Sequence, residues 1–121
     1  MLERKISGDA MLFYDGEKLV LSVDEQETEN GILMAFKGEL RSETAQHIHH
    51  ELDAFISIGV NVVIDFKEVT YISSSVLNAL LNSQHLVDFY SRGSFVLKNI
   101  PDVVYREMES TGTAELLPIE E

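Results

Sequence analysis

Apolar positions recur along the chain with two different periods, and the longest stretch that combines them is Val60–Tyr90. It opens with the β-branched run Val60–Ile64, which is typical of a strand buried on both faces. Asp65–Thr70 is a polar break that predicts a loop, and the short apolar pair Tyr71-Ile72 follows it. Apolar residues then return at three- and four-residue steps, which predicts a helix. The members of this stripe are Val76, Ala79, Leu80, Ser83, Leu86, Val87 and Tyr90.

Three consecutive serines, Ser73, Ser74 and Ser75, stand where the predicted loop becomes the helix. Serine is a favoured N-cap because its hydroxyl accepts a hydrogen bond from the free backbone N–H groups of the first helical turn. The same N–H groups and the helix dipole would also stabilise a phosphate. From the residues alone, a helix cap and an exposed, phosphorylated serine both stay open.

The chain before this stretch favours strands. Two apolar runs, Met11–Tyr14 and Leu19–Val23, flank Asp15-Gly16, a tight-turn signal that predicts a hairpin. We expect weak order at the very start of the chain, and we expect the first strand of the hairpin to add edge area rather than core. The acidic run Asp24–Glu29 is typical of a solvated hairpin tip. Ile32–Phe36 is then a further strand.

Two more helices are predicted on either side of the central stretch. Ser42 suits the N-cap of the first, and Gly59 suits its end. The apolar stripe of this helix consists of Ala45, Ile48, Leu52, Phe55 and Ile56. A short strand at Phe95–Leu97, a helix over Pro101–Ser110 and a closing apolar segment, Leu116–Ile119, complete the chain. Strands that alternate with helices predict an α/β fold in which helices pack against a small mixed sheet.

Composition limits the classes of protein that fit. A chain of 121 residues suits one domain, and no apolar run reaches the ~20 residues that span a membrane. The N-terminus does not resemble a secretory signal and the chain contains no cysteine, so we expect a cytoplasmic protein without disulfides. The formal net charge of −12 disfavours nucleic acid and anionic membrane surfaces as partners. It suits a basic protein partner.

No residue pattern predicts catalysis or a cofactor. His47 and His50 share a helix face with Glu51 beside them, but the sequence places no third zinc ligand. The glycines are dispersed, so no glycine-rich phosphate loop is present. Ser74 and His85 lack the glycine-framed turn of a serine hydrolase. We therefore expect neither an enzyme nor a metal or cofactor site.

Asp65 carries one rival hypothesis. An aspartate at the carboxyl end of a buried strand is where a receiver domain is phosphorylated, and Lys98 vaguely resembles the lysine of that family. A receiver also needs an acidic pair to bind Mg²⁺, and no predicted strand ends in adjacent acids at the right place. A carboxylate that caps a loop is the simpler interpretation of Asp65.

The central stretch resembles STAS domains, the family of sulfate transporters and anti-sigma factor antagonists. Asp65, Ser74, Ser75 and Leu77 match the family pattern, whereas Ser73 stands for an Asp and Val76 and Asn78 stand for glycines. Gly38-Glu39-Leu40, Asn99-Ile100-Pro101 and the run from Met108 through Thr111-Gly112 to Ile119 also resemble it. The resemblance covers about Leu19 to Ile119. It implies an N-terminal extension and hairpin strand over residues 1–18 and a STAS domain over 19–121.

The resemblance implies an anti-sigma factor antagonist that acts by partner switching. Its partners would be an anti-sigma factor, often also a serine kinase, and a phosphatase, and a homodimer is left open. The residue that matches the family's phosphorylated serine is Ser74, with Ser75 and Ser73 as alternative acceptors. The implied partner-binding residues are Gly38, Arg41, Ser42, Lys67, Glu68, Tyr71, Ser73, Ser75 and Asn78. The alternatives are a scaffold module that is never phosphorylated and the receiver-like phospho-aspartate switch.

Overall fold

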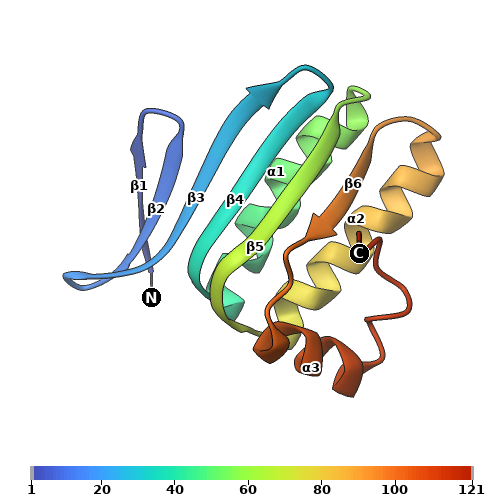
Figure 1. The fold of residues 1–121 in the computed structure, drawn as a ribbon. Helices are drawn as coiled ribbons and strands as arrows, with labels where there is room; N and C mark the ends of the chain where they lie inside the picture. The colour runs from blue at the N-terminus through green and yellow to red at the C-terminus, as the bar shows by residue number, and fades with distance from the viewer. Residues whose placement is uncertain (1, 121) are drawn as a thin grey trace.

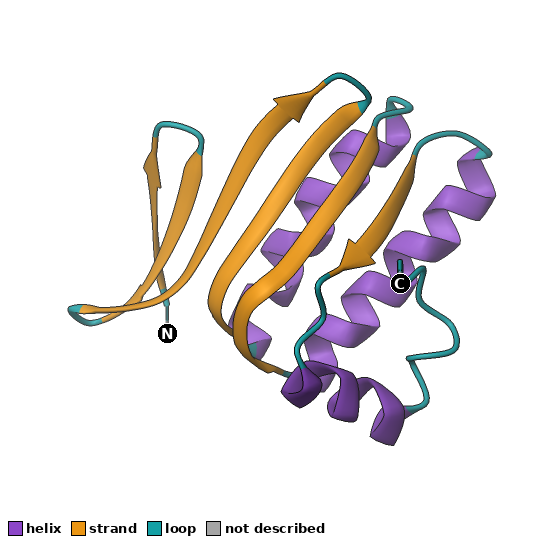
Figure 2. Cartoon of the chain, viewed as in Figure 1, coloured by secondary structure: helices purple, strands orange, loops and turns teal. Residues whose placement is uncertain are grey.

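The computed structural model describes residues 2–120 and contains one six-stranded mixed sheet with helices packed against it. The strands lie side by side in chain order, as Figures 1 and 2 show. The elements are β1 (Glu3–Ser7), β2 (Ala10–Asp15), β3 (Lys18–Thr28), β4 (Gly31–Leu40), a 3₁₀ turn (Ser42–Thr44), α1 (Ala45–Ser57), β5 (Asn61–Ile72), α2 (Ser74–Tyr90), β6 (Ser94–Lys98) and α3 (Asp102–Thr111). The expected α/β fold with a small mixed sheet is confirmed.

The pairing of the strands follows from the connections between them. Short turns connect the first four strands in succession, and each strand from β1 to β4 pairs antiparallel with the next. Helices α1 and α2 carry the chain from β4 to β5 and from β5 to β6, and these strands pair parallel. The ends of β4 and β5 are in register at Leu40 and Ile72, so the chain leaves both strands at the same edge of the sheet. This edge positions the serines discussed below.

Helices α1 and α2 cover one face of the sheet (Figure 1). Alternate residues of β5, namely Val62, Ile64 and Phe66, point into the resulting core and are buried. Val63 points the other way and is only half-buried. The expectation of a strand buried on both faces is therefore wrong, because α1 and α2 cover only one of them.

The prediction that Asp65–Thr70 forms a loop is also wrong, because β5 continues through these residues to Ile72. The register between β4 and β5 shifts at this point, which marks a β-bulge. The Asp65 carboxylate accepts a hydrogen bond from the backbone N–H of Lys67 at 2.9 Å and one from the Asn99 side chain at 3.2 Å. Asp65 thus caps a bulge where the sequence suggested a loop.

The N-terminal region is more structured than its sequence suggested. The hairpin around Asp15 is confirmed, with Gly16 at φ 63° in its two-residue turn. An additional strand, β1, pairs with β2 over residues that the pattern left unassigned. Phe13 is 2% exposed and lies in the main core, where its ring packs 5.4 Å from that of His47 on α1. The expectation that this hairpin adds only edge area is wrong.

The acidic run Asp24–Glu29 is a solvated hairpin tip only in part, because residues 26–29 are exposed next to the β3–β4 turn whereas Asp24 and Glu25 are half-buried in the sheet. β3 extends to Thr28, and its alternation turns Glu25 toward α1. One carboxyl oxygen of Glu25, Oε2, is buried and has no hydrogen-bond partner among the described residues. Burial, together with the carboxyl of Glu51 and the charge of Asp9, raises the pKa of Glu25 to about 7.

The helix ends agree with the sequence at most positions. Gly59 and Gly112 follow α1 and α3 with positive φ, and α3 begins one residue after Pro101. Ser42 is not the N-cap of a long helix, because it is the first residue of the 3₁₀ turn and Thr44 is the N-cap of α1. The closing segment pairs only at Ile119, through a parallel bridge to Leu97 of β6. No helix within residues 2–120 is long and apolar enough to cross a membrane.

Candidate functional site

The three serines sit where β5 passes into α2. Ser73 is the N-cap: its φ and ψ are −87° and 158°, and its Oγ accepts a hydrogen bond from the Val76 backbone N–H at 3.3 Å. Its own backbone N–H donates to the Leu40 carbonyl at 3.0 Å, which ties the start of α2 to the end of β4. The capping function predicted for the serine run therefore belongs to Ser73.

Ser74 and Ser75 occupy the first turn of α2, and both are exposed. Neither hydroxyl is hydrogen-bonded to another described residue, whereas that of Ser73 is used by the cap. The first turn of α2 contains no acidic residue. A negative group on Ser74 would therefore meet the positive end of the helix dipole without a neighbouring acid in the same turn.

A cluster of four alternating charges lies at the end of β4, next to Leu40, whose carbonyl accepts the hydrogen bond from Ser73. Arg41 Nη1 is 3.1 Å from Asp15 Oδ2, and Arg41 Nε is 3.4 Å from Glu39 Oε1. Lys18 Nζ is 3.6 Å from the other carboxylate oxygen of Glu39. The hydrogen bonds that Arg41 donates to Asp15 and, to a smaller extent, to Glu39 raise the pKa of Arg41. We call Asp15, Lys18, Glu39 and Arg41 the charge cluster.

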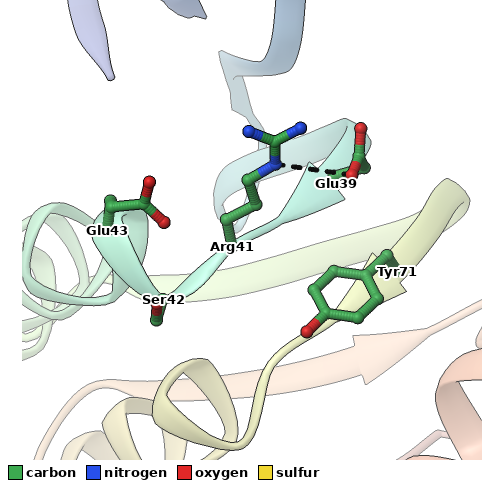
Figure 3. Close-up of a pocket in the computed structure, with 5 residues that line it drawn as sticks. All are labelled: Glu39, Arg41, Ser42, Glu43 and Tyr71. Carbon is green, nitrogen blue, oxygen red and sulfur yellow. Dashed lines mark hydrogen bonds and ion pairs between the residues drawn. The ribbon is translucent and has the colours of Figure 1, made fainter. Parts of the chain in front are cut away.

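A cavity of about 300 Å³ opens next to the charge cluster. Figure 3 shows the five residues that line it: Glu39, Arg41, Ser42, Glu43 and Tyr71. The guanidinium of Arg41 points toward Glu39, and the Ser42 side chain points the opposite way. The Tyr71 ring lies on the opposite side of the cavity from Arg41 and Ser42 (Figure 3). Tyr71 is on the neighbouring strand, in register with Glu39. The surface is mixed in charge and carries one exposed aromatic ring.

The structure brings together only part of the predicted partner-binding set. Gly38, Arg41, Ser42, Tyr71 and Ser73 meet where β4 and β5 end, as the resemblance implied. The proposed roles of these residues in partner binding stay predictions.

The rest of the set lies to either side. Lys67 and Glu68 belong to the bulged part of β5, where Glu68 pairs with Lys37 of β4 at 3.6 Å. Ser75 and Asn78 face a groove between α1 and α2 instead. The remaining residues that line this groove are Ala45, Gln46, His49, Ala79 and Asn82.

Asp15 and Lys18 are the members of this region that the sequence did not indicate. They flank the turn between β2 and β3, and Asp15 is 26 residues from Arg41 along the chain. The sequence signal in this region was the Asp15-Gly16 turn, which predicted a hairpin but did not indicate that Arg41 lies next to it. The pairing arises because β3 lies between β2 and β4 and places the turn near the end of β4.

The histidines of α1 do not form a metal site. Among residues 2–120, no group of three or more His, Cys, Asp or Glu side chains is arranged to hold an ion. His49 instead bonds to Asp53 at 2.9 Å and lies 3.3 Å from Ser83 of α2. Partial burial raises the pKa of Asp53, although His49 and Ser83 act in the opposite direction. Ser83 is fully buried, so this Ser–His–Asp group joins two helices and offers no accessible nucleophile.

Comparisons with known proteins identify the fold. The sequence profile of the STAS domain matches residues 22–121. The solved structure of the anti-sigma factor antagonist SpoIIAA in its unphosphorylated form is similar, with a TM-score of 0.67 and 14% identity over 82% of this chain and 88% of that one. The phosphorylated form of SpoIIAA from Bacillus gives a TM-score of 0.61 and 14% identity over 82% and 91%.

An anti-sigma factor antagonist from Mycobacterium paratuberculosis gives a TM-score of 0.66 and 17% identity over 82% of this chain and 84% of that one. No curated protein matches the sequence. At these identities the structural likeness establishes the fold, while the profile match, which covers most of the chain, establishes the family.

Proposed function

This chain belongs to the STAS domain family, and we propose that it is an anti-sigma factor antagonist that acts by partner switching, with Ser74 as the phosphorylated residue. Membership of this family agrees with the expectation of a regulatory protein rather than an enzyme. In the proposed cycle, the unphosphorylated chain binds an anti-sigma factor in the cytoplasm. A serine kinase then breaks that complex and a phosphatase restores it.

The observation that carries the proposal is the division of roles among the three serines. Ser73 caps α2 with its hydroxyl, so the helix does not depend on the hydroxyl of Ser74. Ser74 is the exposed first residue of α2. A phosphate there adds about −1.5 to −2 charges at a position that the helix dipole favours. The domain can therefore carry the modification without unfolding, and the effect falls on whatever binds the surface.

The proposed partner surface surrounds Ser74. It combines the cavity beside Arg41 and Tyr71 with the start of the groove at Ser75 and Asn78. An exposed aromatic ring and an arginine are residue types that are enriched at protein interfaces. SpoIIAA, a similar fold solved in unphosphorylated and phosphorylated forms, supports a phosphorylation-dependent role for this family member.

The test is a binding experiment with the cognate anti-sigma factor. We expect Ser74→Ala to bind whether or not the kinase is active, and Ser74→Asp to lose binding while melting within about 5 °C of the parent. Ser7→Ala and Ser7→Asp are matched controls, because Ser7 is an exposed serine on β1 outside the proposed surface, and both should bind like the parent. Equal binding by both Ser74 variants would contradict the switch and favour the scaffold alternative.

A second measurement separates the proposed switch from its alternatives. The protein is incubated with the cognate kinase and ATP, and the phosphate is mapped. Phosphoserine at Ser74 supports the proposal, and the absence of phosphate supports the scaffold module. An acid-labile phosphoaspartate at Asp65 would instead indicate a receiver-like mechanism, although the Asp65 carboxylate is already engaged with Lys67 and Asn99.

A further inference from the structure

Arg41 is close to the serine run but is held away from it. Its neighbour Leu40 accepts a hydrogen bond from the Ser73 backbone N–H at 3.0 Å, so the two segments touch through their main chains. The guanidinium nevertheless points toward Glu39 rather than toward the side of the strand on which Ser42 lies (Figure 3). The carboxylate of Asp15, at the end of β2, forms an ion pair with the same guanidinium, with 3.1 Å between Asp15 Oδ2 and Arg41 Nη1.

These bonds are of a kind that another anion can replace. The side chains of Arg41 and Asp15 are 25% and 55% exposed, so water and salt reach the ion pair. Glu39 divides its carboxylate between Arg41 and Lys18, and it keeps a cationic partner when Arg41 leaves. Asp15 has no second cation within ion-pair distance among the described residues. Asp15 is therefore the residue that loses most when Arg41 moves.

A phosphate on Ser74 is a stronger partner for arginine than either carboxylate. It carries up to about two charges and accepts two parallel N–H bonds from one guanidinium. The long, flexible side chain of Arg41 is partly exposed, so it can change rotamer without any movement of β4.

We infer that Arg41 is a two-position switch residue, bound to Asp15 and Glu39 in the unphosphorylated protein and to the phosphate once Ser74 is phosphorylated. The inference deepens the proposed function and rests on it in taking Ser74 as the acceptor. Asp15 competes with the phosphate, so the N-terminal hairpin sets how firmly the phosphate is held. Conversely, phosphorylation releases the β2–β3 turn from the end of β4.

The experiment uses the full chain with phosphoserine installed at position 74 during synthesis, and it follows the phosphate by ³¹P NMR as a function of pH. The second pKa of a phosphoserine is ordinarily about 6. We expect Arg41→Gln to raise it by about one pH unit, because the paired cation is lost. Asp15→Asn should lower it by about 0.5 pH unit, because Arg41 is then freer to pair with the phosphate.

Two controls separate competition for Arg41 from a general charge effect. Glu17→Gln removes the same charge from the same turn without touching Arg41, and it should leave the phosphate pKa nearly unchanged. In the Arg41→Gln background, Asp15→Asn should have no further effect, since its influence passes through Arg41. Amide hydrogen exchange at Gly16 and Glu17 should also be faster in the phosphorylated chain than in the unphosphorylated one.

An Asp15→Asn effect of equal size with and without Arg41 would overturn the inference, as would a phosphate pKa that is the same in the parent and Arg41→Gln. Because the phosphate is installed chemically, neither result depends on a kinase or an anti-sigma factor. If the anti-sigma factor binds both Ser74 variants equally, the proposed function fails while the NMR result stands. If the phosphate pKa does not depend on Arg41, the inference about Arg41 fails, while the binding test of the proposed function is unaffected.

Discussion

The N-terminal hairpin, formed by β1 and β2, has a charged region at each end of β2, and the two regions are opposite in character. At the β2–β3 turn, Asp15 pairs with Arg41 in the charge cluster, at the surface. At the β1–β2 turn, Asp9 lies beside Glu25 and Glu51, and this region contains only like charges. The first region pairs opposite charges that are exposed to solvent. The second brings carboxyl groups together, and Oε2 of Glu25 is buried there.

The difference shows that charge pairing does not hold the hairpin in place. Exposed ion pairs contribute little, and the carboxyls of Glu25 and Glu51 oppose folding when both are ionised. The attachment comes from Phe13, which lies between the two turns in the core. The charge cluster can therefore change its pairing with little effect on stability, whereas the raised pKa of Glu25 makes stability depend on pH.

The largest expected effect comes from removing the apolar attachment. Phe13→Ala should lower the free energy of unfolding by about 3–5 kcal/mol, because it deletes a ring that is 2% exposed and leaves a cavity against α1. Urea unfolding followed by circular dichroism measures this change. Ile6→Ala, at a position 70% exposed in the same hairpin, should change stability little. Similar losses for both variants would show that the hairpin is not anchored by Phe13.

The next effect concerns the carboxyl region. The pKa of Glu25 is about 7 in the folded protein against 4.5 ordinarily, so the protonated carboxyl stabilises the fold. Its contribution is fully present below about pH 4.5 and is lost as the pH rises through about 7. Glu25→Gln keeps a neutral side chain at every pH. It should therefore gain about 1–2 kcal/mol relative to the parent between pH 4.5 and pH 8, after allowance for solvent screening of this half-buried group.

Urea unfolding at several pH values measures that difference between Glu25→Gln and the parent. Glu27→Gln is the matched control, because Glu27 is exposed on the same strand. A stability difference that does not change with pH would contradict the assignment of the raised pKa to Glu25.

The smallest expected effect is at the charge cluster. Asp15→Asn should leave the melting temperature within about 2 °C of the parent, because the pair with Arg41 is exposed. Any remaining difference should disappear in about 0.5 M salt. Differential scanning calorimetry of the two proteins checks both points. A loss of 5 °C or more would mean that this pair helps to hold the hairpin, and the contrast between the two ends of β2 would fail.

Local signals in the sequence were sufficient for most elements. The serine run predicted the start of α2, and Gly59 predicted the end of α1, because caps depend on residues within one turn. The pattern failed where neighbours in space decide. Asp65–Thr70 has the composition of a loop, yet β5 continues through it because β4 supplies main-chain partners. The residues of β1 are all exposed, so no apolar alternation marked them as a strand.

By itself the sequence determined the order of the strands and helices after β1, the hairpin turn at Asp15-Gly16 and the position of the serines at a helix start. These features depend on periodicity and on the conformational preferences of single residues. Only the tertiary structure decided that Arg41 is bound to Asp15 and that the half-buried Glu25 lies beside Glu51. Each of these depends on distance and burial between segments far apart in the chain, which no local pattern encodes.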